Sequence, residues 1–295
     1  MRWPVAILDI GSNSVRLVVY DRRNPGKAYF NEKVGCMLGR DLVKTGRLNP
    51  EGKKKARHAI AGFVELARAM GAPTVHAIAT AAIRDAKDGR AFVKSLRKKI
   101  NTPIRIISGN QEAYYSALAV LSCNPKADGV VADLGGGSLE LARVNRGRVH
   151  ETMSLPLGVL RMAGFGRGVA RMIDEYLEVV PDEMGEDKPL YAAGGTCRAI
   201  AVVHSQLKKD GDKIKGYSMT RSQLLKLRKE MLKLRAEEIM REYNIEIGRA
   251  RALPDACLLL AQAMKRLDSS KLIITTRSLR DGYLYSLMHR KAARR

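Results

Sequence analysis

Two segments of the chain place aspartate, glycine and serine at the same spacing, in a pattern suited to binding phosphate. Residues 8–21 read LDIGSNSVRLVVYD and residues 132–145 read ADLGGGSLELARVN, so Asp9 aligns with Asp133. A turn rich in glycine and serine presents successive backbone N–H groups, which bind anions. An aspartate at the end of the preceding strand can hold Mg²⁺, which bridges phosphate oxygens. Each segment therefore predicts a phosphate site built on a β-hairpin turn.

The two segments lie 124 residues apart, which is about the length of one domain. A period of this size indicates a duplication, because solenoid repeats have periods of about 20–50 residues. Two such turns facing each other would form a clamp across an interdomain cleft, where ligands commonly bind. For either segment alone, the alternative is a plain hairpin with glycine in its turn.

A third glycine-rich element, Gly194-Gly195-Thr196, joins a predicted strand to a predicted helix. The N–H groups and the dipole at a helix N-terminus favour phosphate. An ordinary strand-to-helix turn has the same sequence pattern and is the alternative.

Glu112 and Glu140 are the candidate catalytic carboxylates. Glu112 lies in the first turn of a helix predicted to begin after Ser108-Gly109-Asn110, where the dipole and capping favour an acid. The functional alternative is a general base that takes a proton from an attacking water. Glu140 lies two residues after Ser138, so the two side chains share one face of a strand. Glu140 either reaches the same phosphate or metal, or is a solvated strand residue.

Basic residues dominate the charge of the chain. Its 53 Lys and Arg residues outnumber 30 Asp and Glu residues, which gives a formal net charge of +23. This excess favours polyanionic partners such as polyphosphate or nucleotides. The guanidinium group of Arg84 suits phosphate oxygens, although a surface arginine is the default in so basic a chain. The very basic helix predicted at 220–243 is either a solvated face or a guide for a long polyanion.

Composition argues against several classes of protein. Only 5% of the residues are aromatic, which argues against a base-stacking platform and so against a nucleic-acid partner. The four cysteines include no C-x-x-C pair and fit neither a zinc ribbon nor a disulfide framework. No apolar stretch approaches the roughly 18 residues of a membrane span, so we expect no membrane partner. The default expectation is a reducing, cytoplasmic setting.

The elements that must position these residues form two units of related design. At roughly 150 residues per domain, a chain of 295 residues suggests two domains. Each unit is predicted as a hairpin and a third strand followed by helices and further strands, which indicates an α/β fold with mixed sheets flanked by helices. The break at Asn124-Pro125 sets the predicted domains at 1–124 and 125–295, with the option that the final helix packs back on the first domain. The longer predicted helices cover 81–99, 159–176, 220–243 and 256–267.

These segments together resemble the exopolyphosphatase and guanosine pentaphosphate phosphohydrolase family, in its short two-domain form, within the actin/sugar-kinase/heat-shock-70 superfamily. The resemblance spans the chain, because the family's motifs occur in order from end to end. They are AILDIGSNSVRLVV (6–19), ATAAIRDAKDG (79–89), ISGNQEAYYSALAV (107–120), VVADLGGGSLELA (130–142), SLPLGVLRM (154–162), AAGGTCRAIA (192–201) and the closing helix SLRDGYLY (278–285).

The resemblance implies two ribonuclease H-like domains around an interdomain cleft. It places the family's catalytic glutamate on Glu112 and its metal- and water-positioning carboxylates on Asp133 and Glu140, with Asp9 as the N-terminal counterpart. The family's phosphate-contacting positions fall on Ser12, Asn13, Arg84, Gly136, Gly137, Ser138, Gly194 and Gly195. The sequence departs from the family pattern at Gln111, where relatives often carry an acid, and at Leu139, where many carry threonine.

The function implied is that of a Mg²⁺- or Mn²⁺-dependent exopolyphosphatase, in which Glu112 activates water for attack on the terminal phosphate. Two alternatives stay open. The same fold could act on guanosine pentaphosphate, or it could serve as a non-catalytic regulator that binds guanosine tetraphosphate or polyphosphate. In longer relatives an additional C-terminal helical region helps to hold polyphosphate and to form the dimer. The chain resembles the class without that region, for which a homodimer is an open expectation.

Overall fold

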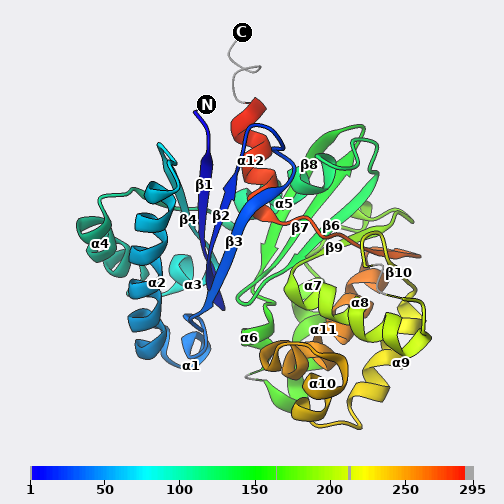
Figure 1. Cartoon of the computed structure of the whole chain (residues 1–295). Helices are drawn as coiled ribbons and strands as arrows, with labels where there is room; N and C mark the ends of the chain where they lie inside the picture. Colours follow the sequence, from blue (N-terminus) through cyan, green and yellow to red (C-terminus); the bar gives the residue numbers. More distant parts are fainter. Residues whose placement is uncertain (1, 164, 212–213, 290–295) are drawn as a thin grey trace. The chain divides into compact units, whose positions relative to one another are not determined.

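The structure is a computed structural model that describes residues 2–163, 165–211 and 214–289. The chain divides into two compact units. The described residues of 1–112 and 283–295 form the first unit, and those of 113–282 form the second. Each unit is built on one β-sheet with its own helices (Figure 1).

The first unit contains a five-stranded mixed sheet. Its strands are β1 (Val5–Ile10), β2 (Ser14–Tyr20), β3 (Ala28–Gly35), β4 (Val75–Ala79) and β5 (Ile104–Ile106). They are ordered β3-β2-β1-β4-β5, with β1 antiparallel to β2 and parallel to β4. Because β1 is apolar at every position except Asp9, it occupies the buried centre of the sheet. The helices of this unit are α1 (Leu42–Thr45), α2 (Pro50–Ala69), α3 (Ala81–Asp85) and α4 (Gly89–Ile100).

The second unit contains a six-stranded mixed sheet in the order β10-β11-β9-β6-β7-β8. Its strands are β6 (Gly129–Leu134), β7 (Leu139–Asn145), β8 (Arg148–Leu155), β9 (Leu190–Ala193), β10 (Ser218–Met219) and β11 (Leu272–Ile274). Its helices are α6 (Val159–Met162), α7 (Val169–Leu177), α8 (Gly195–Lys208), α9 (Arg221–Met231), α10 (Ala236–Tyr243) and α11 (Ile247–Arg266), with short 3₁₀ turns η1 (Gly166–Gly168) and η2 (Asp182–Met184).

The two sheets share one topology. Strands β8-β7-β6-β9-β11 repeat the order and directions of β3-β2-β1-β4-β5, and β10 is an addition at the edge. The two central strands also share one burial pattern, in which only Asp9 in β1 and Asp133 in β6 are not fully buried. The prediction of two α/β units with mixed sheets flanked by helices is confirmed.

Two helices contain the points at which the chain passes between the units. These are α5 (Gly109–Leu121), divided after Glu112, and α12 (Leu279–His289), divided after Gly282. The later residues of α5 belong to the second unit because their apolar side chains pack on its sheet, where Ala113 and Ala117 join a cluster with Val131 and Ala142. The Asn124-Pro125 break lies beyond α5, in the connection to β6.

Several predicted helices are interrupted in the structure. The segment 81–99 forms α3 and α4, 159–176 forms α6, η1 and α7, and 220–243 forms α9 and α10. By contrast, α11 begins nine residues before the predicted start at Ala256 and contains Pro254 in its interior. In the described part of the chain, no helix is long and apolar enough to cross a membrane.

The environment of the cysteines leads to a first test of the fold. Cys36, Cys197 and Cys257 are buried and Cys123 is exposed. Burial raises the pKa of the Cys197 thiol to about 12, and a thiol held protonated in this way reacts slowly. We therefore expect a thiol reagent at about pH 8 to modify Cys123 alone in the native protein, and all four cysteines after denaturation. Rapid modification of a second thiol in the native protein would contradict the packing described here.

Candidate active site

The two hairpin turns close in the same way. In the first unit, the N–H of Gly11 donates to the carbonyl of Ser14 at 3.0 Å. In the second unit, the N–H of Gly135 donates to the carbonyl of Ser138, also at 3.0 Å. The repeat seen in the sequence therefore extends to the backbone geometry of both turns.

In the first unit, the segment after β3 holds the carbonyl groups of the turn. The N–H groups of Cys36 and Met37 donate to the carbonyl of Asn13 at 2.9 and 2.8 Å, and the N–H of Gly39 donates to the carbonyl of Ser12 at 2.9 Å. These hydrogen bonds fix the orientation of the turn's peptide groups.

In the second unit, the segment after β8 has the same role. The N–H of Leu160 donates to the carbonyl of Gly136 at 2.9 Å, and the Arg161 side chain donates through Nε to the carbonyl of Gly137 at 2.6 Å. Gly158 packs directly on this turn: a Cβ atom added there would lie 2.3 Å from the carbonyl carbon of Gly137. Only glycine, which has no Cβ atom, allows this approach. A larger residue at position 158 would displace the turn.

These contacts leave peptide N–H groups in both turns available to a ligand. Among the described residues, the N–H groups of Ser12, Asn13, Gly136 and Gly137 donate to no protein acceptor. Successive N–H groups of this kind form an anion-binding nest. The Ser138 side chain is buried beside the second turn. The structure thus places Ser12 and Asn13 in one turn, and Gly136, Gly137 and Ser138 in or beside the other.

The candidate metal ligands Asp133 and Glu140 are direct neighbours. They are opposite residues of the antiparallel pair β6–β7, so their side chains lie on the same face of the sheet. The hydroxyl of Ser116 donates to Oδ2 of Asp133, and the hydroxyl of Ser154 donates to Oε1 of Glu140 at 2.9 Å. Two carboxylates with two hydroxyls form an all-oxygen donor set, and Mg²⁺ is commonly bound through one or two carboxylates together with substrate phosphates. The residues present therefore fit a magnesium ion.

The corresponding pair in the first unit has a different charge. Asp9 is opposite Arg16 across β1 and β2, and Arg16 also donates to Oδ1 of Asn31 at 2.8 Å. No group of three or more histidine, cysteine or acidic side chains arranged to hold a metal occurs among the described residues. The symmetry of the turns therefore does not extend to the carboxylates, and the acidic pair is confined to the second unit.

Glu112 forms an ion pair with Arg84 in the first unit. Nη1 of Arg84 lies 2.9 Å from Oε2 of Glu112, and the two side chains are 21% and 11% exposed. The guanidinium group also donates to Oδ1 of Asp85 at 3.1 Å and to the carbonyl of Ile107 at 3.4 Å. Arg84, predicted to contact phosphate, is thus attached to the predicted general base. A guanidinium held in this way fixes the orientation of the carboxylate and leaves its own positive charge beside it.

The residue next to Glu112 caps the helix. The N–H of Gln111 donates to Oγ of Ser108, and the N–H of Ser108 donates to Oε1 of Gln111, each at 3.2 Å. This reciprocal pair is a capping box. Capping therefore does not require Glu112, which removes one of the two structural reasons for an acid at that position.

The third glycine-rich element follows β9 and lies beside the end of β6. Gly194 has a φ of +108°, and a Cβ atom there would lie 2.5 Å from the carbonyl oxygen of Leu134 and 3.4 Å from Oδ1 of Asp133. Gly195 and Thr196 follow as the first residues of α8. The structure therefore brings the helix N-terminus of α8 beside the carboxylate of Asp133.

Two arginines near this element were not predicted from the sequence. The guanidinium of Arg249 packs on Gly195, 2.9 Å from the position of an added Cβ atom. Arg198 lies in the first turn of α8, and its buried Nη1 has no hydrogen-bond partner among the described residues. Burial lowers the pKa of Arg198, and the nearby Arg249 and Arg280 lower it further. Nothing in the sequence distinguishes Arg249 among the many basic residues. The position of Arg198 two residues after Thr196 was the available signal.

Comparison with protein families gives a match over most of the chain. The model of the Ppx/GppA phosphatase family matches residues 18–291. Among curated proteins, Exopolyphosphatase 1 of Mycobacterium tuberculosis is 24% identical over 299 aligned positions, which cover 95% of this chain and 87% of the relative.

Solved structures of similar length share the fold. A Ppx/GppA family member from Aquifex aeolicus superposes with a TM-score of 0.80 and is 26% identical, covering 97% of this chain and 98% of that one. A protein from Cytophaga hutchinsonii described as an exopolyphosphatase has a TM-score of 0.87 at 22% identity, covering 97% and 98% of the two chains.

Proposed function

Because the chain belongs to the Ppx/GppA phosphatase family, we propose that it hydrolyses the terminal phosphoanhydride bond of inorganic polyphosphate with the help of a divalent cation. The observation that carries this proposal is the ion pair between Arg84 and Glu112. It provides an oriented carboxylate that can accept a proton from water, beside a guanidinium whose positive charge suits phosphate oxygens. The names of the relatives support polyphosphate as the substrate.

In this proposal the two units act on one substrate molecule. The free N–H groups of the two turns bind oxygens of the terminal phosphates, because nests of this kind favour anions. The N-terminus of α8, with Arg249 beside Gly195, adds donors for a neighbouring phosphate. The repeated topology supports assigning the ribonuclease H-like fold to both units.

Glu112 then serves as the general base. The oxygen of a water molecule attacks the terminal phosphorus in line with the bridging oxygen, and the water proton passes to Glu112. The bond from phosphorus to the bridging oxygen breaks, which releases orthophosphate and a chain shortened by one unit. In phosphoryl transfer the protein contributes mainly positioning and charge stabilisation, and Arg84 supplies positive charge next to the reacting group.

Asp133 and Glu140 are the residues of this chain that would hold the divalent cation. Such an ion neutralises charge on the phosphate oxygens. Ser116 and Ser154 orient the two carboxylates through their hydroxyl groups. Asp9 contributes from the first unit in the same proposal, as the counterpart of Asp133.

Removal of the metal tests this part of the proposal. We expect EDTA to abolish phosphate release, and Glu140→Gln to raise the Mg²⁺ concentration for half-maximal rate by about tenfold or more. The matched control is Glu151→Gln, which changes an exposed glutamate on the neighbouring strand β8. If Glu140→Gln and Glu151→Gln have the same magnesium dependence, Glu140 is not a metal ligand.

The substrate is tested by offering long-chain polyphosphate and guanosine pentaphosphate in parallel and measuring phosphate release. We expect a higher kcat/KM for polyphosphate. A preference for guanosine pentaphosphate would keep the chemistry and change the substrate. Binding of either compound without turnover would overturn the enzymatic proposal in favour of a regulator.

A further inference from the structure

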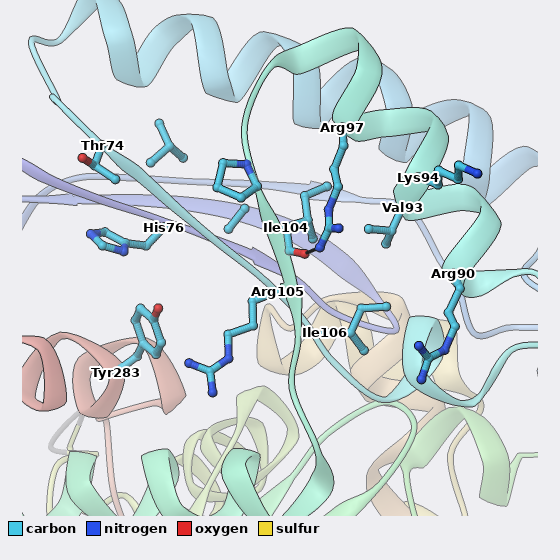
Figure 2. A pocket seen from close by; sticks show the side chains of 13 residues that line it. Thr74, His76, Arg90, Val93, Lys94, Arg97, Ile104, Arg105, Ile106 and Tyr283 are labelled. Carbon is cyan, nitrogen blue, oxygen red and sulfur yellow. Dashed lines mark hydrogen bonds between the residues drawn. The ribbon is translucent and has the colours of Figure 1, made fainter.

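A groove of about 780 Å³ lies on the first unit, apart from the turns described above. It runs between α4 and the edge of the sheet formed by β4 and β5, and Tyr283 of α12 closes part of it. Figure 2 shows the side chains that line it. Strand β5 is the last strand of its sheet, so one wall of the groove is a sheet edge.

The charged residues that line this groove are all basic. Arg90, Lys94 and Arg97 project from α4 and Arg105 from β5 (Figure 2). The three residues of α4 follow one another at intervals of four and three, which places them along one side of the helix. None of the described residues lining the groove is aspartate or glutamate.

Three of these cations have no ion-pair or hydrogen-bond partner for their side chains among the described residues. They are Arg90, Lys94 and Arg105, whereas Arg97 donates to the carbonyl of Ile104. By comparison, nearby Lys53 lies 2.8 Å from Oδ2 of Asp88. Unpaired charges of one sign along a groove create a positive potential that attracts polyanions.

The groove is connected to the candidate base through neighbouring residues of the first unit. Ile106, a lining residue, is followed by Ile107, whose carbonyl accepts a hydrogen bond from Arg84. Arg84 in turn holds Glu112. A linear ligand lying along β5 therefore extends towards the residues proposed to hydrolyse its end.

We infer that this groove binds the distal phosphates of a condensed phosphate chain while its terminal phosphate lies at the site of Glu112. The inference takes the identity of this ligand, inorganic polyphosphate, from the proposed function. It adds a second binding region formed by residues of α4 and β5. A single-stranded nucleic acid fits the groove less well. Tyr283 is only 5% exposed, and its ring packs edge-on against His76 with the ring centroids 6.0 Å apart, so it does not offer an open face for base stacking.

The test compares two triple variants that each remove three positive charges. The groove variant carries Arg90→Gln, Lys94→Gln and Arg105→Gln. The control carries Lys54→Gln, Lys98→Gln and Lys99→Gln, which are exposed residues of α2 and α4 outside the groove. Equilibrium binding of long-chain polyphosphate is measured at several salt concentrations, and kcat/KM is measured for long-chain polyphosphate and for tripolyphosphate. Thermal unfolding checks that both variants are folded.

We expect the groove variant to bind long-chain polyphosphate about tenfold more weakly. The slope of the logarithm of its binding constant against the logarithm of the salt concentration should be smaller by about 2, since each phosphate contact contributes about 0.7 to this slope for a single-stranded polyanion. Its kcat/KM for tripolyphosphate stays within about twofold of the wild-type value, since that substrate is too short to occupy the groove. Equal losses in the groove variant and the control would overturn the inference. Equal competition by single-stranded DNA would replace the proposed ligand with nucleic acid. The binding measurement does not require turnover, so an inactive protein with groove-specific binding refutes the proposed function alone.

Discussion

Replacement of Glu112 by glutamine is expected to reduce phosphate release from polyphosphate by a factor of about 10³, while polyphosphate binding changes only a few-fold. Glutamine keeps the size of the side chain and can still accept a hydrogen bond from Arg84, but it cannot take a proton from water. The capping box of Ser108 and Gln111 is unaffected, so the start of α5 remains formed. The rate is measured as phosphate released at saturating polyphosphate and Mg²⁺.

Glu51→Gln is the matched control for this substitution. Glu51 also lies in the first turn of a helix, α2, but it is exposed and lies outside the candidate site. The control therefore separates the loss of charge at a helix N-terminus, which is worth about 0.3–1 kcal/mol, from the loss of a base. Removal of a general base lowers a rate by about 10²–10⁴-fold. If Glu112→Gln retains more than about a tenth of the wild-type rate, Glu112 does not have the proposed role.

The substitution with the second largest expected effect is Gly158→Ala. The new Cβ atom would lie 2.3 Å from the carbonyl carbon of Gly137 and 2.4 Å from that of Gly136. Both are backbone atoms of the turn proposed to bind phosphate, so the turn itself must move to relieve the contact. Overpacking of this kind costs about 1–3 kcal/mol or more in stability, and a displacement of about 1 Å in a site lowers the rate on the order of a hundredfold.

Gly168→Ala is the control for the glycine substitution. It adds the same methyl group at an exposed position where nothing lies within 4 Å of the new atom. We expect Gly158→Ala to lower both the unfolding temperature and the phosphate-release rate, and Gly168→Ala to leave both near the wild-type values. Wild-type activity in Gly158→Ala would show that the turn does not bind the reacting phosphate.

The repeated turns were predictable because their structure depends on local sequence. In both copies an aspartate near the end of an apolar strand, followed by glycine and serine, favours a tight hairpin, and both turns close through the same hydrogen bond from Gly11 or Gly135. The repeat also predicted two related sheets, because each hairpin begins the same order of strands. That Glu112 is the base, and that Asp133 and Glu140 bind a metal, stay predictions.

Features that depend on tertiary contacts were not predictable. Pro254 has no N–H to donate within a helix and favours a break, yet α11 continues through it because its apolar side chains, including Leu253 and Leu259, are buried in the core of the second unit. The basic segment 220–243 has a continuous helical pattern but is interrupted between α9 and α10. Arg249 approaches Gly195 across more than fifty residues of sequence, and no local pattern reports such a contact.

The products of long-chain polyphosphate hydrolysed in ¹⁸O-labelled water with Mg²⁺ test the proposed reaction most directly. When water attacks the terminal phosphorus, its labelled oxygen becomes part of the released orthophosphate. We therefore expect phosphorus NMR to show singly labelled orthophosphate accumulating while the chain shortens from its end, and Glu112→Gln to show neither change at the same protein concentration. Cleavage in the interior of the chain, label absent from the orthophosphate, or tight binding without any release would contradict the proposed reaction.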